Sequence, residues 1–219
     1  TGHAITFITP DAQRTFSVHL GAAIYMHQDD IPEEDLAAAK VLHIEGYQLE
    51  GRTQEAVLFA MDTAKKQGTK VSIDLADAGL IRRQKALLQR VLLDYADMVF
   101  LNEVEAREFT GKETEEAIQE LAQYAGIVVL KLGERGSLIL ADGVVTKIDA
   151  VPANAIDTTG AGDTYAAGFL YGLCQGWPLE KCGKLGSLFA SRIVEQKGVR
   201  MSALDKSIIL RSIEDKPKL

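Results

Sequence analysis

The sequence lacks the features of a membrane, secreted or nucleic-acid-binding protein. No apolar run reaches the roughly 18–20 residues that span a bilayer, and no basic segment followed by an apolar one opens the chain. Its 219 residues include only two cysteines, too few for a disulfide framework. The net charge of −7 disfavours a general nucleic-acid binder, which usually presents a basic surface. These absences predict a cytoplasmic protein with no membrane or nucleic-acid partner.

The composition is that of an ordinary folded domain. With 47% hydrophobic and 25% charged residues, the chain can bury a sizeable core. The acidic balance leaves nucleotides open as ligands, because backbone amides and a few cations bind them locally. Cys174 and Cys182 are interpreted as small apolar helix residues. The four histidines show no metal-ligand spacing.

Short apolar strands alternate with helical segments through the middle of the chain. Such alternation predicts an α/β fold with a parallel sheet and helices on both faces. The expected strands are 41–45, 71–75, 98–101 and 127–132, and the expected helices are about 52–67, 80–93 and 103–124. Beyond them, we expect strands near 137–141 and 144–149 joined by an Asp142-Gly143 turn, then helices at about 160–175, 179–195 and 203–214.

The N-terminal part has a different pattern. Strand-like runs at 4–9 and 14–19 flank a turn-rich stretch and predict a hairpin. Pro32 and the acids after it indicate the start of a helix that ends near Lys40. The prediction is a β flap at residues 1–22 and one α/β domain at 23–219.

Residues 157–163 combine three features that suit an anion. The small residues Gly160, Ala161 and Gly162 let an anion approach the backbone amides. A helix begins there, so its free N–H groups and positive dipole end face the anion. Asp163 lies in the first turn, where a base would take a proton from a hydroxyl that attacks a phosphate. Alternatively, Asp157 or Thr159 is an ordinary N-cap and Asp163 is an acid favoured by the dipole.

Other polar residues directly follow expected strands. Ligands of open parallel sheets bind beyond the carboxyl ends of the strands. Asp74, the Asn102-Glu103 pair and the loop from Gly133 to Gly136 occupy such positions. Asp74 could either cap a helix or line the site.

Four motifs in a fixed order carry a family resemblance. The run DTTGAGDTYAAGF at 157–169 closely resembles the C-terminal signature of the ribokinase-like, or PfkB, carbohydrate kinases. The other three resemble the family's Asn-x-x-Glu element (102–106), its strand–Gly-x-x-Gly loop (130–137) and the loop after its last long helix (197–199). Val199 departs from the Ala or Cys that is usual there. The resemblance extends from about Thr1 to about Val199.

The resemblance implies an ATP-dependent sugar or nucleoside kinase with a ribokinase-like fold. Asp163 would be the general base for a substrate hydroxyl, usually a CH2OH. The amides of Gly160, Ala161 and Gly162 would form the anion hole for the transferring γ-phosphoryl group. The implied nucleotide-binding residues are Asn102, Glu105, Lys131, Gly133, Gly136, Thr158, Ser187, Ala190 and Gly198, with Ser187 and Ala190 near the adenine.

The resemblance also implies metal ions. Asn102 and Glu105 would organise Mg2+ through water, and backbone carbonyls at Asp157 and Thr159 could hold a monovalent cation such as K+. Plainer alternatives stay open for single residues. Glu105 could be an ordinary first-turn helix acid, and Lys131 a solvated charge at a strand end. Gly133 and Gly136 could simply shape a turn.

Part of the family pattern is missing at the N-terminus. Relatives usually begin with a first β-strand, a Gly-Gly-Asn type element and an acidic residue that grips the substrate hydroxyls. None of these precedes the flap, so we expect an N-terminally truncated chain that holds the ATP half and the base. A nucleotide-binding fragment or regulatory module without catalysis is therefore the second hypothesis. A dinucleotide-dependent oxidoreductase is disfavoured, because its glycine-rich turn after the first strand is absent.

The substrate and the assembly are only loosely indicated. The segments at 9–15, 20–22, 44–47 and 186–191 resemble the adenosine-kinase branch more than ribokinase proper. The expected partner is a small sugar or nucleoside. A monomer and a homodimer joined through the flap both fit.

Overall fold

The computed structural model describes residues 2–9 and 14–201. The expected helix at 203–214 and most of the turn between the two flap strands lie outside these residues. The chain divides into two compact units. One unit contains Val18–Leu132 and Leu140–Val145, and the other contains Gly133–Ile139 and the chain from Thr146 onward, with the flap strands divided between them. The predicted division at residue 22 stays a prediction.

Four parallel strands form the centre of the first unit. They are β3 (Val41–Glu45), β4 (Lys70–Asp74), β5 (Met98–Asn102) and β6 (Ile127–Lys131). Most apolar residues of β4, β5 and β6, such as Ile73, Val99 and Val128, are fully buried. Near-continuous apolar runs of this kind are typical of parallel strands covered on both faces. The predicted strands are therefore confirmed.

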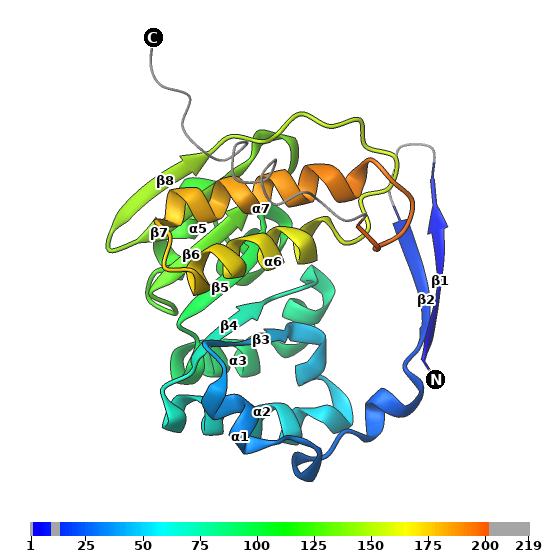
Figure 1. Ribbon diagram of the computed structural model, residues 1–219, viewed down its shortest axis with the longest axis vertical. Helices are drawn as coiled ribbons and strands as arrows, with labels where there is room; N and C mark the ends of the chain where they lie inside the picture. The colour runs from blue at the N-terminus through cyan, green and yellow to red at the C-terminus, as the bar shows by residue number, and fades with distance from the viewer. Residues whose placement is uncertain (1, 10–13, 202–219) are drawn as a thin grey trace. The chain divides into compact units, whose positions relative to one another are not determined.

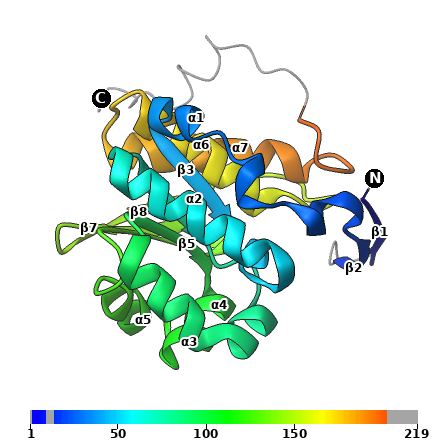
Figure 2. The same ribbon diagram turned by 90° about the horizontal axis from the view of Figure 1, so that it is seen from below.

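Helices flank this sheet. They are α1 (Glu33–Ala38), α2 (Gln54–Gln67), α3 (Ala78–Tyr95), α4 (Glu103–Thr110) and α5 (Thr114–Leu121). Helix α2 packs on β3 and β4, and α4 packs on β5 and β6. From α1 to α5, consecutive helices contact one another (Figure 2). Short 3-10 turns at Gly21–Tyr25, Gln28–Asp30, Gly46–Leu49 and Gly51–Thr53 complete the connections between β2 and α2.

The single helix predicted over 103–124 is wrong. Gly111 adopts a left-handed conformation with φ 77°, and its N–H donates to the carbonyl of Arg107, which ends α4. A residue without a Cβ adopts this conformation readily, so glycine is common just after helices. The segment therefore forms two helices, α4 and α5, rather than one.

The two shorter strands predicted near 137–141 and 144–149 are confirmed. The strands of the main sheet follow one another as β3-β4-β5-β6-β7-β8, where β7 is Ser137–Ala141 and β8 is Val144–Ile148. The connection between β7 and β8 is a two-residue turn in which Asp142 has φ 50° and Gly143 φ 74°. Positive φ at both positions is what a tight antiparallel hairpin requires.

The second unit contains two long helices that lie side by side, α6 (Ala161–Cys174) and α7 (Leu179–Val194) (Figure 1). Glycines let their backbones approach closely. A Cβ added to Gly168 would lie 3.0 Å from the Cα of Gly186, and one added to Gly186 would lie 2.8 Å from the carbonyl oxygen of Tyr165. Cys174 is the last residue of α6 and Cys182 lies on α7, which confirms their interpretation as helix residues.

This close approach makes Gly186→Ala a test of the α6–α7 packing. Alanine is favoured over glycine in a helix interior by about 1 kcal/mol. The added methyl group would nevertheless overlap a backbone carbonyl, and overpacking of this kind costs about 1–3 kcal/mol. We expect a net loss of stability in urea unfolding. A gain in stability would show that the helices are not so closely packed at this point.

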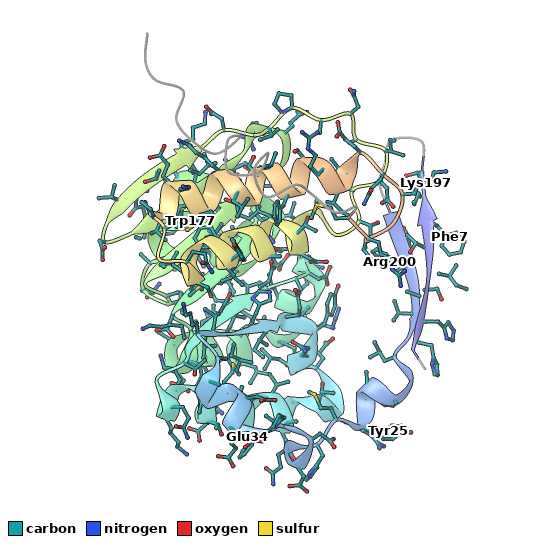
Figure 3. All side chains as sticks on the ribbon, in the orientation of Figure 1. Phe7, Tyr25, Glu34, Trp177, Lys197 and Arg200 are labelled. Carbon is teal, nitrogen blue, oxygen red and sulfur yellow. The ribbon has the colours of Figure 1, made fainter. Side chains whose placement is uncertain are left out.

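The flap is a two-stranded sheet of β1 (His3–Ile8) and β2 (Arg14–His19), as predicted. It carries large apolar side chains in exposed positions, including Ile5 on β1. Phe7 on the same strand is another (Figure 3). Among the described residues, no helix combines the length and apolar character needed to cross a bilayer.

Candidate functional site

Three strand ends of the first unit bring polar residues to one edge of the sheet. Asp74 is the last residue of β4, Asn102 of β5 and Lys131 of β6. In the parallel register, Asn102 pairs with Lys131, and Asp74 pairs with Phe100 on β5. The carboxyl edge of these strands is where ligands of open α/β sheets bind.

Asn102 and Glu105 form a closed hydrogen-bonded pair at the start of α4. The Asn102 side chain accepts from the Glu105 amide at 2.9 Å, and the Glu105 carboxylate accepts from the Asn102 amide at 2.7 Å. The Asn102 Nδ2 group also donates to Glu105 Oε1 at 2.6 Å. This is a capping box, which satisfies free amides at a helix start. Glu105 is therefore a first-turn helix acid, as the plainer alternative held, but that role does not explain why its side chain is buried.

Lys131 is not a solvated charge. Its Nζ lies 2.5 Å from Asp74 Oδ2, and the two side chains are only 16% and 4% exposed. The other carboxylate oxygen of Asp74 accepts from the Ala76 amide at 3.0 Å. Sequence reasoning noted Asp74 as a strand-end acid but did not connect it with Lys131.

Burial dominates the electrostatics of this cluster. It raises the pKa of Glu105 from 4.5 to about 7, an effect that the positive charge of Lys131 partly offsets and the negative charge of Asp74 increases. Burial by itself lowers the pKa of Lys131, but the nearby carboxylates of Asp74 and Glu105 together outweigh it, so the pKa is raised overall. A single ammonium group therefore faces two buried carboxyl groups.

The raised pKa of Glu105 predicts a specific pH dependence of stability. In the unfolded chain the carboxyl group ionises near its usual 4.5, whereas in the folded protein it ionises near 7. Between these values the folded state holds more protons, so stability falls as pH rises, by at most about 1.4 kcal/mol per pH unit and about 3 kcal/mol in total.

This dependence is measured by denaturant unfolding of the metal-free protein from pH 4.5 to 8. Glu105→Gln cannot ionise, so its unfolding free energy should lack the fall with pH that Glu105 causes. The difference between the wild-type and variant curves gives the contribution of Glu105. Parallel curves for the two proteins would show that Glu105 ionises normally in the folded state.

The second unit holds the helix start predicted to bind an anion. Gly160 is the N-cap of α6, with φ 78° and no side-chain cap bond. The alternative with Asp157 or Thr159 as the N-cap is therefore wrong. The Ala161 amide donates to the Thr158 carbonyl in a long bond of 3.3 Å, so this member of the expected anion hole already has an acceptor. Asp163 lies in the first turn and is exposed.

Asp157 ties this loop to the segment after α7. One oxygen of its buried carboxylate accepts from the amide and the hydroxyl of Thr159, at 2.9 and 2.6 Å. The other oxygen accepts from the Gly198 amide at 3.0 Å. The side chain of Asp157 thus orders the backbone just before the anion-hole residues.

The loop before β7 is shaped by its glycines. Gly133 and Gly136 have φ 61° and 88°, and the Gly136 amide donates to the Gly133 carbonyl at 3.1 Å. A Cβ on Gly136 would overlap the carbonyl oxygen of Ile148 and lie 2.8 Å from the Ala150 amide nitrogen, whereas a Cβ on Gly133 would meet nothing within 4 Å. The turn interpretation holds for both glycines, and Gly136 is also a point of close backbone contact.

Ser187, on α7, binds the backbone at residues 149–151, next to the point where Gly136 approaches it. Its buried hydroxyl donates to the Asp149 carbonyl and accepts from the Val151 amide, each at 3.1 Å. Ala190 lies half-buried on the same helix. Sequence reasoning missed a buried hydrogen bond of 2.6 Å between Ser137 and Tyr165, which joins the end of the glycine loop to α6.

The donor set of Asn102 and Glu105 suits a magnesium ion bound through water rather than directly. All their polar side-chain atoms already bond within the pair, but carboxylate and amide oxygens have lone pairs left for a water molecule. Across the described residues, no group of three or more His, Cys, Asp or Glu is arranged to hold a metal ion.

Comparison with known proteins shows the family. The pattern of the pfkB family carbohydrate kinase matches residues 1–206, so the chain belongs to this family. A 5-dehydro-2-deoxygluconokinase from Geobacillus kaustophilus is 33% identical over 79% of the chain and 55% of its own length. The chain thus spans about half the length of this curated relative.

Two solved structures share the fold closely. A probable sugar kinase from Rhizobium etli CFN 42 has a TM-score of 0.93 and 32% identity, and an adenosine kinase from Sinorhizobium meliloti has a TM-score of 0.91 and 30% identity. Each alignment covers 98% of this chain and 66% of the solved one. The ribokinase-like α/β fold predicted from the sequence is confirmed.

Proposed function

We propose that the protein transfers the γ-phosphoryl group of ATP to a hydroxymethyl group of a sugar or nucleoside. One observation carries the proposal: an exposed carboxylate, Asp163, lies in the first turn of α6, directly after the small residues Gly160 to Gly162. A helix N-terminus attracts anions through its free amides and its dipole. A carboxylate beside such a site suits a base rather than an anion ligand.

In the proposed reaction, Asp163 takes the proton of the substrate hydroxyl as its oxygen attacks the γ-phosphorus. The new O–P bond forms while the bond to the β–γ bridging oxygen breaks, and ADP leaves with that electron pair. The amides at the start of α6, with those of Gly160 and Gly162 foremost, stabilise the charge on the transferring group. Asp157 supports them by ordering the preceding loop.

Magnesium, when bound, neutralises charge on the phosphates. Asn102 and Glu105 would hold its water ligands, and Lys131 would contact the nucleotide. Gly133, Gly136, Thr158, Ala190 and Gly198 would border the nucleotide through backbone and small side chains. Ser187 would lie near the adenine, and its hydrogen bonds to the 149–151 backbone support a role in holding that backbone in place. The carbonyls of Asp157 and Thr159 remain the proposed monovalent cation site.

The substrate class rests on the relatives and on sequence cues. Named activities among the relatives include a 5-dehydro-2-deoxygluconokinase and an adenosine kinase. The segments that resemble the adenosine-kinase branch favour a nucleoside. We place the reaction in the cytoplasm, on a dissolved small molecule.

A nucleotide-binding module without catalysis is the second candidate. The chain spans 55% of the length of the 5-dehydro-2-deoxygluconokinase it resembles, so nucleotide binding is tested separately from turnover. Both candidates require ATP binding, and only the first requires turnover.

The test measures ADP release with a panel of nucleosides and sugars, alongside calorimetric binding of Mg–ATP. Acceptor-dependent ADP release supports the kinase. Binding of ATP without release for any acceptor supports the module. A protein that does neither contradicts both candidates.

A further inference from the structure

The buried ion pair between Asp74 and Lys131 spans a strand that contains neither residue. Asp74 ends β4 and Lys131 ends β6, and β5 lies between these strands in the sheet. Neighbouring strands are about 4.8 Å apart, so the pair bridges two strand spacings. The ion pair consequently crosses the end of β5, and the charge of Lys131 also acts on Glu105 in the first turn of α4.

Stability alone does not explain why this ion pair is buried. Burying an ion pair gives little net stability compared with well-packed apolar side chains, because both charges lose their hydration. The bond to Asp74 uses one of the three N–H donors of the ammonium group. The remaining donors are suited to an anion at the carboxyl edge of the sheet.

We propose that Asp74 is a positioning residue, which holds the Lys131 ammonium across the end of β5 so that it donates to a phosphate of the bound nucleotide. Besides Asp74, Glu105 is the carboxylate that most strongly favours the charged form of Lys131. An ammonium paired there would be displaced from the phosphate and would occupy the group proposed to organise magnesium. The inference rests on the proposed function, since it needs a nucleotide at this edge.

The test compares the affinity of the full chain for Mg–AMP-PNP, by calorimetry, with its stability in urea. The variants are Asp74→Asn, Lys131→Met and the double variant. We expect each single variant to bind roughly tenfold to hundredfold more weakly, because a charge-assisted hydrogen bond is lost or displaced. The double variant should bind about as weakly as Lys131→Met alone, since Asp74 acts only through Lys131.

Stability separates positioning from a purely structural role. Each single variant breaks a buried pair and should be destabilised, whereas the double variant removes both charges and should be more stable than either. If the double variant regained both stability and affinity for Mg–AMP-PNP relative to the single variants, the proposal would be overturned. The sign of the Asp74→Asn effect is also decisive, because removal of a negative charge would by itself strengthen the binding of an anion.

Lys131→Arg is the conservative variant. It keeps the positive charge and the pairing with Asp74, so it should retain more affinity than Lys131→Met. Equal losses for the two would also count against positioning. A wild-type chain that does not bind Mg–AMP-PNP at all would refute the proposed function itself. Normal binding by the wild type and by all variants would refute only the role of Asp74.

Discussion

Asp163→Asn is expected to lower acceptor-dependent ADP release by about 10²–10⁴-fold, while Mg–AMP-PNP binding changes little. A general base contributes a rate factor of this size, because the hydroxyl is a poor nucleophile while it keeps its proton. Asparagine matches aspartate in shape but cannot accept the proton. The measurement is the turnover rate at saturating ATP, together with the calorimetric affinity for the nucleotide analogue.

The matched control is Glu180→Gln. Glu180 is the first-turn acid of α7, is exposed like Asp163, and pairs with Lys184 at 2.8 Å. If Asp163 only balances the dipole of α6, the two substitutions should behave alike, with stability changes of about 0.3–1 kcal/mol and unchanged turnover. Full activity of Asp163→Asn would therefore contradict the assignment of the base.

Gly136→Ala is expected to destabilise the protein by about 3 kcal/mol or more. Two effects combine at this position. Alanine is strained at φ 88°, and its methyl group would overlap the backbone carbonyl of Ile148, which cannot move aside as a flexible side chain would. The measurement is the free energy of unfolding in urea.

Gly133→Ala separates the two effects. Gly133 lies in the same loop with φ 61°, and a Cβ there meets nothing within 4 Å. This variant should lose only the conformational part, about 1 kcal/mol. Equal losses in the two variants would show that the approach of Gly136 to the 148–150 backbone adds nothing.

The sheet could be predicted from the sequence because its signals are local. Each parallel strand is a short apolar run bounded by polar or turn residues, as in 127–132. The break between α4 and α5 was missed because the apolar spacing continues on both sides of Gly111. The glycine itself was the available signal for a helix end.

The candidate site was only partly predictable, for a different reason. The Asn102–Glu105 pair is a local motif, and its capping geometry follows from a spacing of three residues. The pairing of Asp74 with Lys131 is not local, because 57 residues separate them and only the order of β4, β5 and β6 brings them together. The hydrogen bonds of Ser187 to the 149–151 backbone depend likewise on tertiary packing.

The hydrogen bonds of the Asp157 carboxylate determine which parts of the second unit unfold together in local fluctuations. It joins the loop before α6 to Gly198, 41 residues further along, so the two helices form a segment closed at its base. Neither end of that segment can fray alone without leaving a buried carboxylate short of a donor. The loop before α6 and Gly198, beyond the end of α7, should thus lose their protection from hydrogen exchange as one cooperative unit.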